Sequence, residues 1–167
     1  APDCLLAFYA DTSGDCPPQF PGHSCFGWMA YRRSTDGGRN WSAPRELDYS
    51  KKVFLEGIHT ISCEKAVSPA PNVIVLFCLV NDRCAPFCCS PWGVPTYLIS
   101  RDGGETWSEP RILGDQRGRI YDARIIGDEI LVLQCCNQNF EGRDPLHHYA
   151  LYVSRNGGET FALISIP

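Results

Sequence analysis

Four polar residues in the second half of the chain are the candidates for binding a ligand: Arg124, Tyr121, Asp144 and His147. Arg124 is the centre of this group, because a planar guanidinium can donate to both oxygens of a carboxylate. The alternative is that Arg124 only forms an ion pair with a nearby acid such as Asp122. No two of these side chains form a convincing acid–nucleophile pair, so we predict no catalytic residue.

Cysteine is the other reactive residue type, and the chain has ten cysteines. An even and dense set is typical of an oxidising compartment and predicts roughly five disulfides. The sequence therefore predicts an extracellular (secreted) protein, or one in the lumen of the secretory pathway. The predicted disulfide cysteines are Cys4, Cys16, Cys25, Cys63, Cys78, Cys84, Cys88, Cys89, Cys135 and Cys136.

The pairing of these cysteines stays open at this point. A local candidate is Cys16 with Cys25, and the others are bonds between loops among Cys84, Cys88, Cys89, Cys135 and Cys136. Zinc is the alternative for the cysteines of residues 84–89, but no second cysteine pair has zinc-finger spacing. We therefore predict no metal ion and no cofactor.

Composition and charge exclude several classes of protein. The chain has 167 residues, of which 44% are hydrophobic and 20% charged, as expected for one folded domain. The formal net charge of −4 and the absence of a basic run argue against a nucleic-acid partner. No stretch approaches about 18 consecutive apolar residues, so no membrane-spanning helix is predicted.

An eight-residue pattern recurs three times, and each copy is named a box. Box one is Ser34–Trp41, box two is Ser100–Trp107 and box three is Ser154–Phe161. A second pattern, such as "APNVIVLF", recurs in step with the boxes at residues 1–8, 70–77 and 126–133. Two patterns that recur in step indicate one structural unit repeated three times.

Each unit is expected to contain only β-strands. An apolar run of strand length follows a turn dipeptide, a further strand leads into each box, and another leaves it. In units two and three, another apolar segment precedes the turn. Four antiparallel strands repeated radially form a β-propeller blade, and the box is then the turn between the third and fourth strands. We predict blade one at about 1–50, without its inner strand, blade two at about 58–114 and blade three at about 118–167.

The residue types of the box fit a tight turn. The glycines permit positive φ, the Asp or Asn can accept hydrogen bonds from N–H groups of its own turn, and the final aromatic ring can pack into the blade. The predicted structural box residues are Ser34, Asp36, Gly38, Trp41, Ser100, Asp102, Gly104, Trp107, Ser154, Asn156, Gly158 and Phe161.

These boxes resemble the Asp-box, Ser-x-Asp-x-Gly-x-Thr-Trp, of the BNR repeats in sialidases (neuraminidases) and related propellers. Box two matches every fixed position, whereas box one has Asn40 for Thr and box three has Asn156 for Asp and Phe161 for Trp. The stretch "YRRSTDGGRNWSAPREL" is similar to the opening blade of sialidases. The resemblance covers nearly the whole chain but about half of a six-bladed sialidase, and it implies an all-β, sialidase-like β-propeller.

The resemblance does not carry the catalytic residues of sialidases onto this chain. Sialidases bind the sugar carboxylate with three arginines, and use an Asp and a Tyr–Glu pair for catalysis, on the face opposite the boxes. Where one of those arginines is expected, this chain has Asp11 and Thr12, and residues 25–28 replace the acid Asp. Arg124 opens the first strand of blade three on that face, and Tyr121, Asp144 and His147 could line it.

Three further expectations concern other residues. Arg32 and Arg33 are expected to be solvated strand residues. Eight of the ten cysteines are expected on the face opposite the boxes, with Cys4 and Cys63 elsewhere. The motif Asn40-Trp41-Ser42 fits an N-glycosylation site, although its place inside a box turn argues against occupancy.

Three blades do not close a ring, and an unclosed end leaves an unpaired edge. The first resolution, which we favour, is that the chain is part of a longer protein. The second is that two copies join into one ring, and the third is that another propeller half or partner chain supplies the missing part.

The predicted function is that of a secreted, disulfide-rich, sialidase-like propeller module without independent hydrolase activity. Such a module would bind sialylated or other glycans, or act structurally in an extracellular assembly. The alternative is the N-terminal part of an active exo-α-sialidase whose remaining catalytic residues lie outside this chain. Whether the chain alone is an enzyme stays open, although the missing catalytic positions favour a negative answer.

Overall fold

The computed structural model describes residues 4–11, 28–48, 59–82, 93–114, 118–137 and 147–164. These residues form three antiparallel sheets. Sheet I contains β1 (Leu5–Asp11), β2 (Trp28–Ser34) and β3 (Arg45–Glu46). Sheet II contains β4 (His59–Ala70), β5 (Val73–Asp82), β6 (Val94–Ser100) and β7 (Arg111–Ile112). Sheet III contains β8 (Gly118–Ile126), β9 (Glu129–Asn137), β10 (His147–Ser154) and β11 (Ala162–Ile164).

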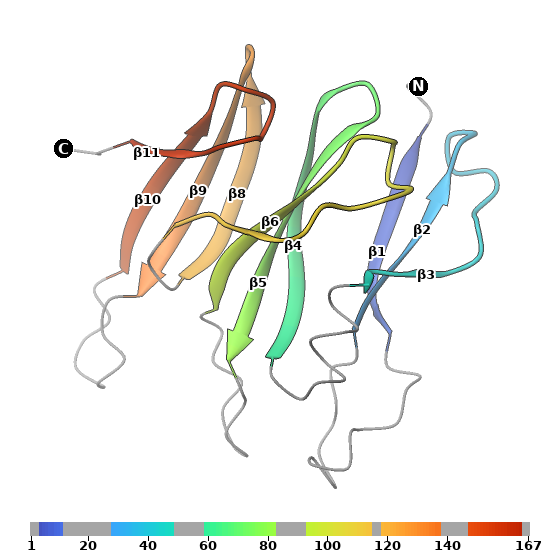
Figure 1. The fold of residues 1–167 in the computed structure, drawn as a ribbon, viewed down its shortest axis with the longest axis horizontal. Helices are drawn as coiled ribbons and strands as arrows, with labels where there is room; N and C mark the ends of the chain where they lie inside the picture. Colours follow the sequence, from blue (N-terminus) through green and yellow to red (C-terminus); the bar gives the residue numbers. More distant parts are fainter. Residues whose placement is uncertain are drawn as a thin grey trace, which may run out of the picture.

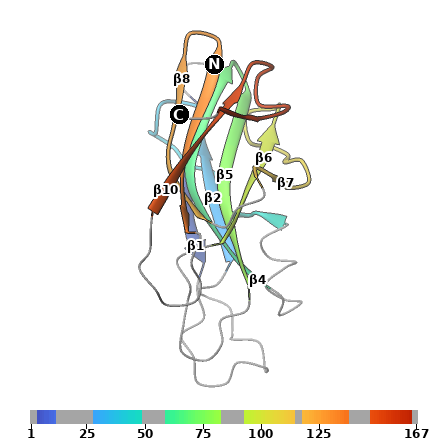
Figure 2. The ribbon, with the colours of Figure 1, turned by 90° about the vertical axis from the view of Figure 1, so that its left-hand side faces the viewer.

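The three sheets stand side by side in chain order, with sheet II between the other two (Figure 1). Every strand pair is antiparallel, and strands that follow each other in sequence are neighbours in the sheet. The three boxes follow β2, β6 and β10, so all three box turns lie at the same end of the molecule (Figures 1 and 2).

Sheet II is buried on both faces because its central strand is apolar at every position from 73 to 80. Alternate side chains of a strand point to opposite faces. One face contributes Val75, Phe77 and Leu79 to a core with sheet III, and the other contributes Leu76 and Cys78 to a core with sheet I. The partners in the first core include Ile120, Ile130, Val132 and Tyr152, and those in the second include Met29 and Leu47.

The prediction of an all-β architecture with three repeated antiparallel sheets is confirmed. The described residues form an all-β structure, and each box connects the third strand of a unit to the fourth. Sheet I has one strand fewer than the other two sheets, as predicted for blade one.

The strand lengths differ from the prediction at two places. The first strands begin earlier than the apolar segments that predicted them, residues 64–70 and 121–126, since β4 starts at His59 and β8 at Gly118. The fourth strands are shorter, and in sheets I and II they follow Pro44 and Pro110, which have no N–H to donate to the ladder. Backbone hydrogen bonds continue on both sides of Pro44: Ser42 N–H donates to Arg33 O and Leu47 N–H to Met29 O, each at 2.8 Å.

One disulfide joins Cys63 of β4 to Cys78 of β5, which are directly paired residues on neighbouring strands. The sequence placed these two cysteines in different regions, because it could not show that β4 and β5 bring them opposite each other. Cys4 has a free thiol, which donates to the carbonyl oxygen of Gly103 at 3.7 Å. Cys16, Cys25, Cys84, Cys88 and Cys89 lie outside the described residues, and the side chain of Cys136 is not described.

Candidate binding site between the inner strands

The three box turns are built by one repeated hydrogen-bond pattern. In box two, the Ser100 hydroxyl accepts from Gly104 N–H at 2.8 Å and donates to Asp102 Oδ1 at 2.8 Å. The Asp102 carboxylate also accepts from the N–H groups of Glu105 and Thr106, at 3.0 and 2.9 Å, and from the Thr106 hydroxyl at 2.6 Å. The carboxylate therefore replaces the backbone partners that a tight turn cannot supply.

Boxes one and three keep this pattern with different side chains. In box one, the Asn40 amide takes the place of the Thr hydroxyl and donates to Asp36 Oδ2 at 2.7 Å. In box three, Asn156 accepts from Thr160 N–H at 3.0 Å, and its own amide donates to the Thr160 hydroxyl at 2.8 Å. The boxes therefore have the same geometry, although the third one has the uncharged Asn156 in place of the aspartate.

The box aromatic residues join each sheet to the preceding one. Trp107 of box two has its ring centroid 5.8 Å from that of Phe8 and 6.0 Å from that of Tyr31, both in sheet I. The sequence predicted that the ring would pack into its own blade, and the ring does pack against the core that sheet II shares with sheet I, so it also joins the two sheets.

Box three repeats this arrangement one sheet further along. Phe161 lies 5.7 Å from Phe77 and 4.9 Å from Tyr97, both in sheet II, between ring centroids. An aromatic ring at the end of a turn can reach the neighbouring sheet because the box projects beyond the strand that it ends.

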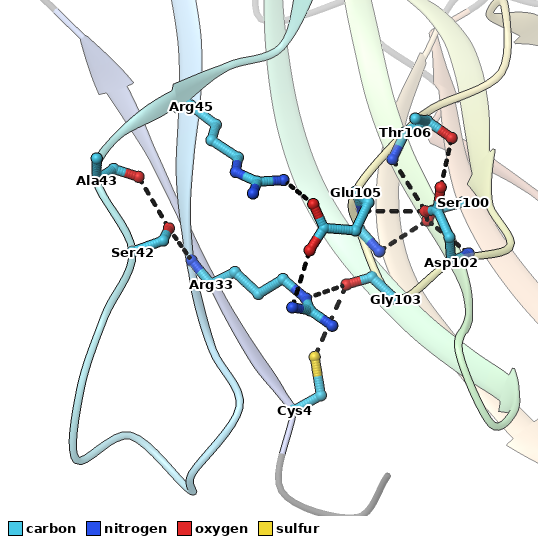
Figure 3. A network of polar contacts seen from close by, with 11 residues as sticks. Cys4, Arg33, Ser42, Ala43, Arg45, Ser100, Asp102, Gly103, Glu105 and Thr106 are labelled. Atoms are coloured by element: carbon cyan, nitrogen blue, oxygen red, sulfur yellow. Dashed lines mark hydrogen bonds and ion pairs between the residues drawn. The ribbon is translucent and has the colours of Figure 1, made fainter.

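Arginines of one sheet also bind the box of the next (Figure 3). Arg33 donates to Gly103 O at 2.8 Å and forms an ion pair with Glu105 at 2.9 Å, and Arg45 binds the same Glu105 carboxylate. The expectation that Arg33 is solvated is therefore wrong, whereas Arg32 is exposed as expected. Arg111 makes the corresponding ion pair with Glu159 of box three at 3.0 Å.

The boxes thus serve the fold, and a candidate ligand site lies elsewhere. A hollow of about 580 Å³ lies between the inner strands of sheets II and III. It is lined by Glu64 and Lys65 of β4, by Arg119, Ile120 and Tyr121 of β8, and by Cys135 of β9. Arg119 and Cys135 are paired near the start of β8, whereas the turn between β8 and β9 follows Ile126 at the other end of the strand. The hollow therefore lies at the end of the sheets opposite this turn and the boxes.

Two irregularities in the strands place residues in this hollow. The β4–β5 register shifts between Cys63 and Lys65, and the β8–β9 register shifts between Ile120 and Asp122. The additional residues are Glu64 and Tyr121, and both line the hollow. A bulge bends its strand and redirects a side chain, and bulges are over-represented next to functional sites.

The electrostatics of the hollow are dominated by one ion pair and one further cation. Arg119 donates from Nη2 to Glu64 Oε1 at 2.9 Å, and Glu64 Oε2 accepts from Ile120 N–H at 3.1 Å. Arg119 Nε also donates to Glu64 Oε1, at 3.2 Å, so the Glu64 carboxylate accepts from three N–H groups. Lys65 adds a second positive charge, which leaves the lining with one more cation than anion.

The exposed face beside the hollow carries two aromatic rings. Tyr121 and Tyr149 form an edge-to-face pair, with ring centroids 6.2 Å apart and an interplanar angle of 82°. Their side chains remain 64% and 53% exposed, although tyrosine in a sheet is usually covered. Cys135 also lines the hollow, and burial raises the pKa of its thiol above the ordinary value.

The four predicted ligand residues have different positions. Tyr121 lines the hollow. Arg124 lies near the end of β8 rather than at its start, and its guanidinium binds Asp122 at 2.7 Å, which is the alternative that the sequence left open. Asp144 lies outside the described residues, and His147 begins β10 opposite Asn137, with its side chain not described.

Glu64, Lys65 and Arg119 were missed by the sequence analysis. The unit alignment placed the start of the β8 segment at Tyr121, so Arg119 was assigned to the connection before it. The signal that could have found Arg119 is a strand pattern, in which the apolar Ile120 lies between Arg119 and Tyr121. This alternation would have extended the predicted strand back to Gly118.

Comparison with known proteins bears on the boxes. The sequence model of the family described as BNR/Asp-box repeat matches residues 32–43 and 98–109. These two stretches are BNR/Asp-box repeats. They contain box one and box two, and they are consistent with sialidase-like repeats. Box three, in which Asn156 and Phe161 replace Asp and Trp, lies outside both matches but has the same Asp-box geometry. No curated protein has significant similarity to the chain.

The described part of the chain contains neither a cluster of metal ligands nor a membrane-spanning helix. Among those residues, no three His, Cys, Asp or Glu side chains are placed so that they could hold a metal ion. No helix within the same residues has the length and apolarity to cross a membrane.

Proposed function

We propose that this chain is a secreted, sialidase-like Asp-box module whose hollow binds an acidic glycan. The observation that carries the proposal is the lining: Lys65 and Arg119 supply positive charge on the inner strands, and Tyr121 supplies an exposed ring beside them. A lysine or arginine binds a sugar carboxylate by charge-assisted hydrogen bonds. An exposed tyrosine offers an apolar face to the C–H groups of a sugar ring together with a hydroxyl for hydrogen bonding.

The same lining favours binding over hydrolysis. Glycoside hydrolysis uses two carboxyl groups, or a carboxyl group with another nucleophile, and at least one of them must exchange a proton with the glycosidic bond. Glu64 is the carboxylate that lines the hollow, and its two oxygens already accept from Arg119 and from Ile120 N–H. The catalytic alternative therefore requires residues other than those of this hollow.

The secreted location is part of this proposal. It is supported by the number of cysteines in the sequence and by the Cys63–Cys78 bond, because disulfides persist mainly in oxidising compartments.

The proposal is tested by titrating the chain with sialyllactose and, separately, with lactose, while following the backbone resonances by NMR. We expect saturable shifts around β4 and β8 with sialyllactose and none with lactose. Lys65→Met removes one charge-assisted contact, worth about 1.5–3 kcal/mol, so the affinity is expected to fall at least tenfold.

Arg124→Met is the matched control, because Arg124 is likewise a cation on an inner strand, β8 rather than β4, but is bound to Asp122. Its affinity for sialyllactose is expected to be unchanged. Equal shifts with both sugars would contradict recognition of the acid, and release of sialic acid from a fluorogenic sialoside by this chain would favour the exo-sialidase alternative.

A further inference from the structure

The outer face of sheet III has the features that receive a box on the other two sheets. Gly104 of box two is seated on Leu6, and Gly158 of box three is seated on Val75: a Cβ at either glycine would lie 2.8 or 2.6 Å from the facing side chain. The residue of sheet III that corresponds to Leu6 and Val75 in the repeated pattern is Leu131. Leu131 is half-buried and receives no box within the described part of the chain.

The aromatic part of this receiving surface is also repeated. Trp107 binds the paired residues Phe8 and Tyr31, and Phe161 binds the paired residues Phe77 and Tyr97. The corresponding pair in sheet III is Leu133 and Leu151, which are directly opposite each other on β9 and β10. Both are apolar and half-buried, and together with Leu131 they form what we name the acceptor face.

Sheet I carries the opposite feature, a box that contacts no other sheet through its ring within the residues that the structure describes. Trp41 of box one is 40% exposed, and its indole N–H donates to Gly38 O of its own turn at 3.0 Å. A Cβ at Gly38 would meet Leu5 of the same sheet at 3.3 Å rather than a neighbouring sheet. Box one is thus folded like the other boxes but has its ring facing solvent.

We propose that box one of one copy of this chain docks on the acceptor face of a second copy. The contact would repeat the two sheet-to-sheet contacts already present within the chain, with Trp41 against Leu133 and Leu151. It would be a head-to-tail contact, because the donor and acceptor surfaces are different parts of the chain, and two copies would make this contact twice to close one ring of their sheets.

The charges on the two outer faces favour box one, rather than a box like box two or box three, as the partner of the acceptor face. Boxes two and three carry Glu105 and Glu159, which bind Arg45 and Arg111 of the preceding sheet. In the strand register, Arg45 lies opposite Tyr31 of β2, and Arg111 lies opposite Tyr97 of β6. The corresponding position in sheet III is Ile164, which lies opposite Leu151 and offers an acid no ion-pair partner. Box one has Arg39 where the other two have their glutamates, so it brings no acid that would lack an arginine partner.

Two further residues at the proposed contact also differ from their counterparts between sheets I and II. Leu98 of sheet II packs in the same core as Met29 of sheet I. In the proposed contact, the residue corresponding to Leu98 is Arg32, which is exposed, and the residue corresponding to Met29 is Tyr149, which is 53% exposed. An arginine over a tyrosine ring is a favourable cation–π contact, so both replacements are compatible with the same packing.

The experiment uses two variants that each block one surface. Trp41→Glu blocks the donor, and Leu133→Glu blocks the acceptor. The wild-type chain at micromolar concentration is expected to sediment at twice 18.6 kDa, and each variant alone at 18.6 kDa. An equimolar mixture of the two variants is expected to recover a dimer, because it retains one unblocked donor and one unblocked acceptor.

The mixture also shows that both variants are folded, since an unfolded chain would not complement the other. Trp41→Phe is the matched control, because Phe161 already fills this role in box three, and it should dimerise as wild type does. A monomeric wild-type chain would overturn the proposal. So would a dimer that survives Trp41→Glu, because that result would indicate another interface.

Discussion

At the residue scale, the box turn depends on one side-chain oxygen that accepts several N–H and O–H groups. Asp36 and Asp102 both perform this role, and the donors hold the pKa of each carboxyl at about 2, below its ordinary value of 3.8. For Asp36 the largest cause is the Asn40 N–H, and for Asp102 it is the Thr106 hydroxyl. The ionised form is therefore stabilised by folding.

This pKa difference predicts a loss of stability in acid. Between about pH 4 and pH 2 the unfolded chain binds more protons at these two sites than the folded chain does, so stability is full above about pH 4 and falls as the pH approaches 2. Asp36→Asn with Asp102→Asn is expected to flatten this dependence, as measured by urea unfolding at several pH values. Asn156→Asp should steepen it, because it introduces a carboxylate into the third box. An unchanged slope in all three chains would contradict the assignment.

Two neighbouring glycines in box three predict different costs for the same substitution. Gly157 and Gly158 have φ of +68° and +94°, so alanine at either position costs about 1 kcal/mol in backbone strain. A Cβ at Gly157 meets nothing within 4 Å, whereas a Cβ at Gly158 would lie 2.6 Å from Val75 Cγ2. Gly158→Ala is therefore expected to lower the free energy of unfolding by about 1–3 kcal/mol more than Gly157→Ala. Equal losses in chemical denaturation would show that the box does not press on sheet II.

At the element scale, the sheets are joined by a box ring and by a box glutamate, and the two contacts differ in strength. The Trp107 ring packs into the core between sheets I and II, whereas the Glu105 side chain is 40% exposed. Water does not screen the packing energy of a buried ring. It does screen an exposed ion pair, which typically contributes only about 0–1 kcal/mol to stability. The ring is therefore expected to provide most of the contact energy.

Two variants measure this difference. Trp107→Ala is expected to lower the free energy of unfolding by about 3–5 kcal/mol, and Glu105→Gln by less than about 1 kcal/mol. Urea unfolding followed by circular dichroism gives both values. A larger loss for Glu105→Gln than for Trp107→Ala would mean that the arginine network, rather than the ring, holds the two sheets together.

At the scale of the whole molecule, sheet II has a core on each face, so sheets I and III depend on the same central strand. Ile130 is fully buried in the core between sheets II and III. Sheet I packs on the other face of sheet II. If the three sheets unfold together, a change at Ile130 lowers the protection of amides in all of them.

Ile130→Val removes one methylene group and is expected to lower the free energy of unfolding by about 1 kcal/mol. This corresponds to about a fivefold loss of hydrogen-exchange protection, which should appear in β1 and β2 as well as in β9. A loss confined to sheet III would show that the sheets open independently. Ala162→Gly, at an exposed position of β11, serves as a control outside the core.

The sequence alone determined the strands, their order and the box turns. These features follow from local patterns: the alternation or continuity of apolar residues gives the strands, and a fixed set of Ser, Asp or Asn and Gly residues forms the turn. The matched spacing of two repeated patterns also predicted three similar units with a shorter first one. The box hydrogen bonds connect residues within about four positions, so they could be read without knowing the tertiary structure.

Only the tertiary structure decided which residues meet across units. The sequence could not show that Trp107 reaches Phe8, that Cys63 lies opposite Cys78, or that Arg33 binds Glu105. The candidate hollow depends on bulges in two strands of different sheets, and a bulge changes the direction of a side chain without changing the apolar pattern. Contacts between distant segments depend on register and on sheet packing, and neither is encoded by the spacing of residues along one strand.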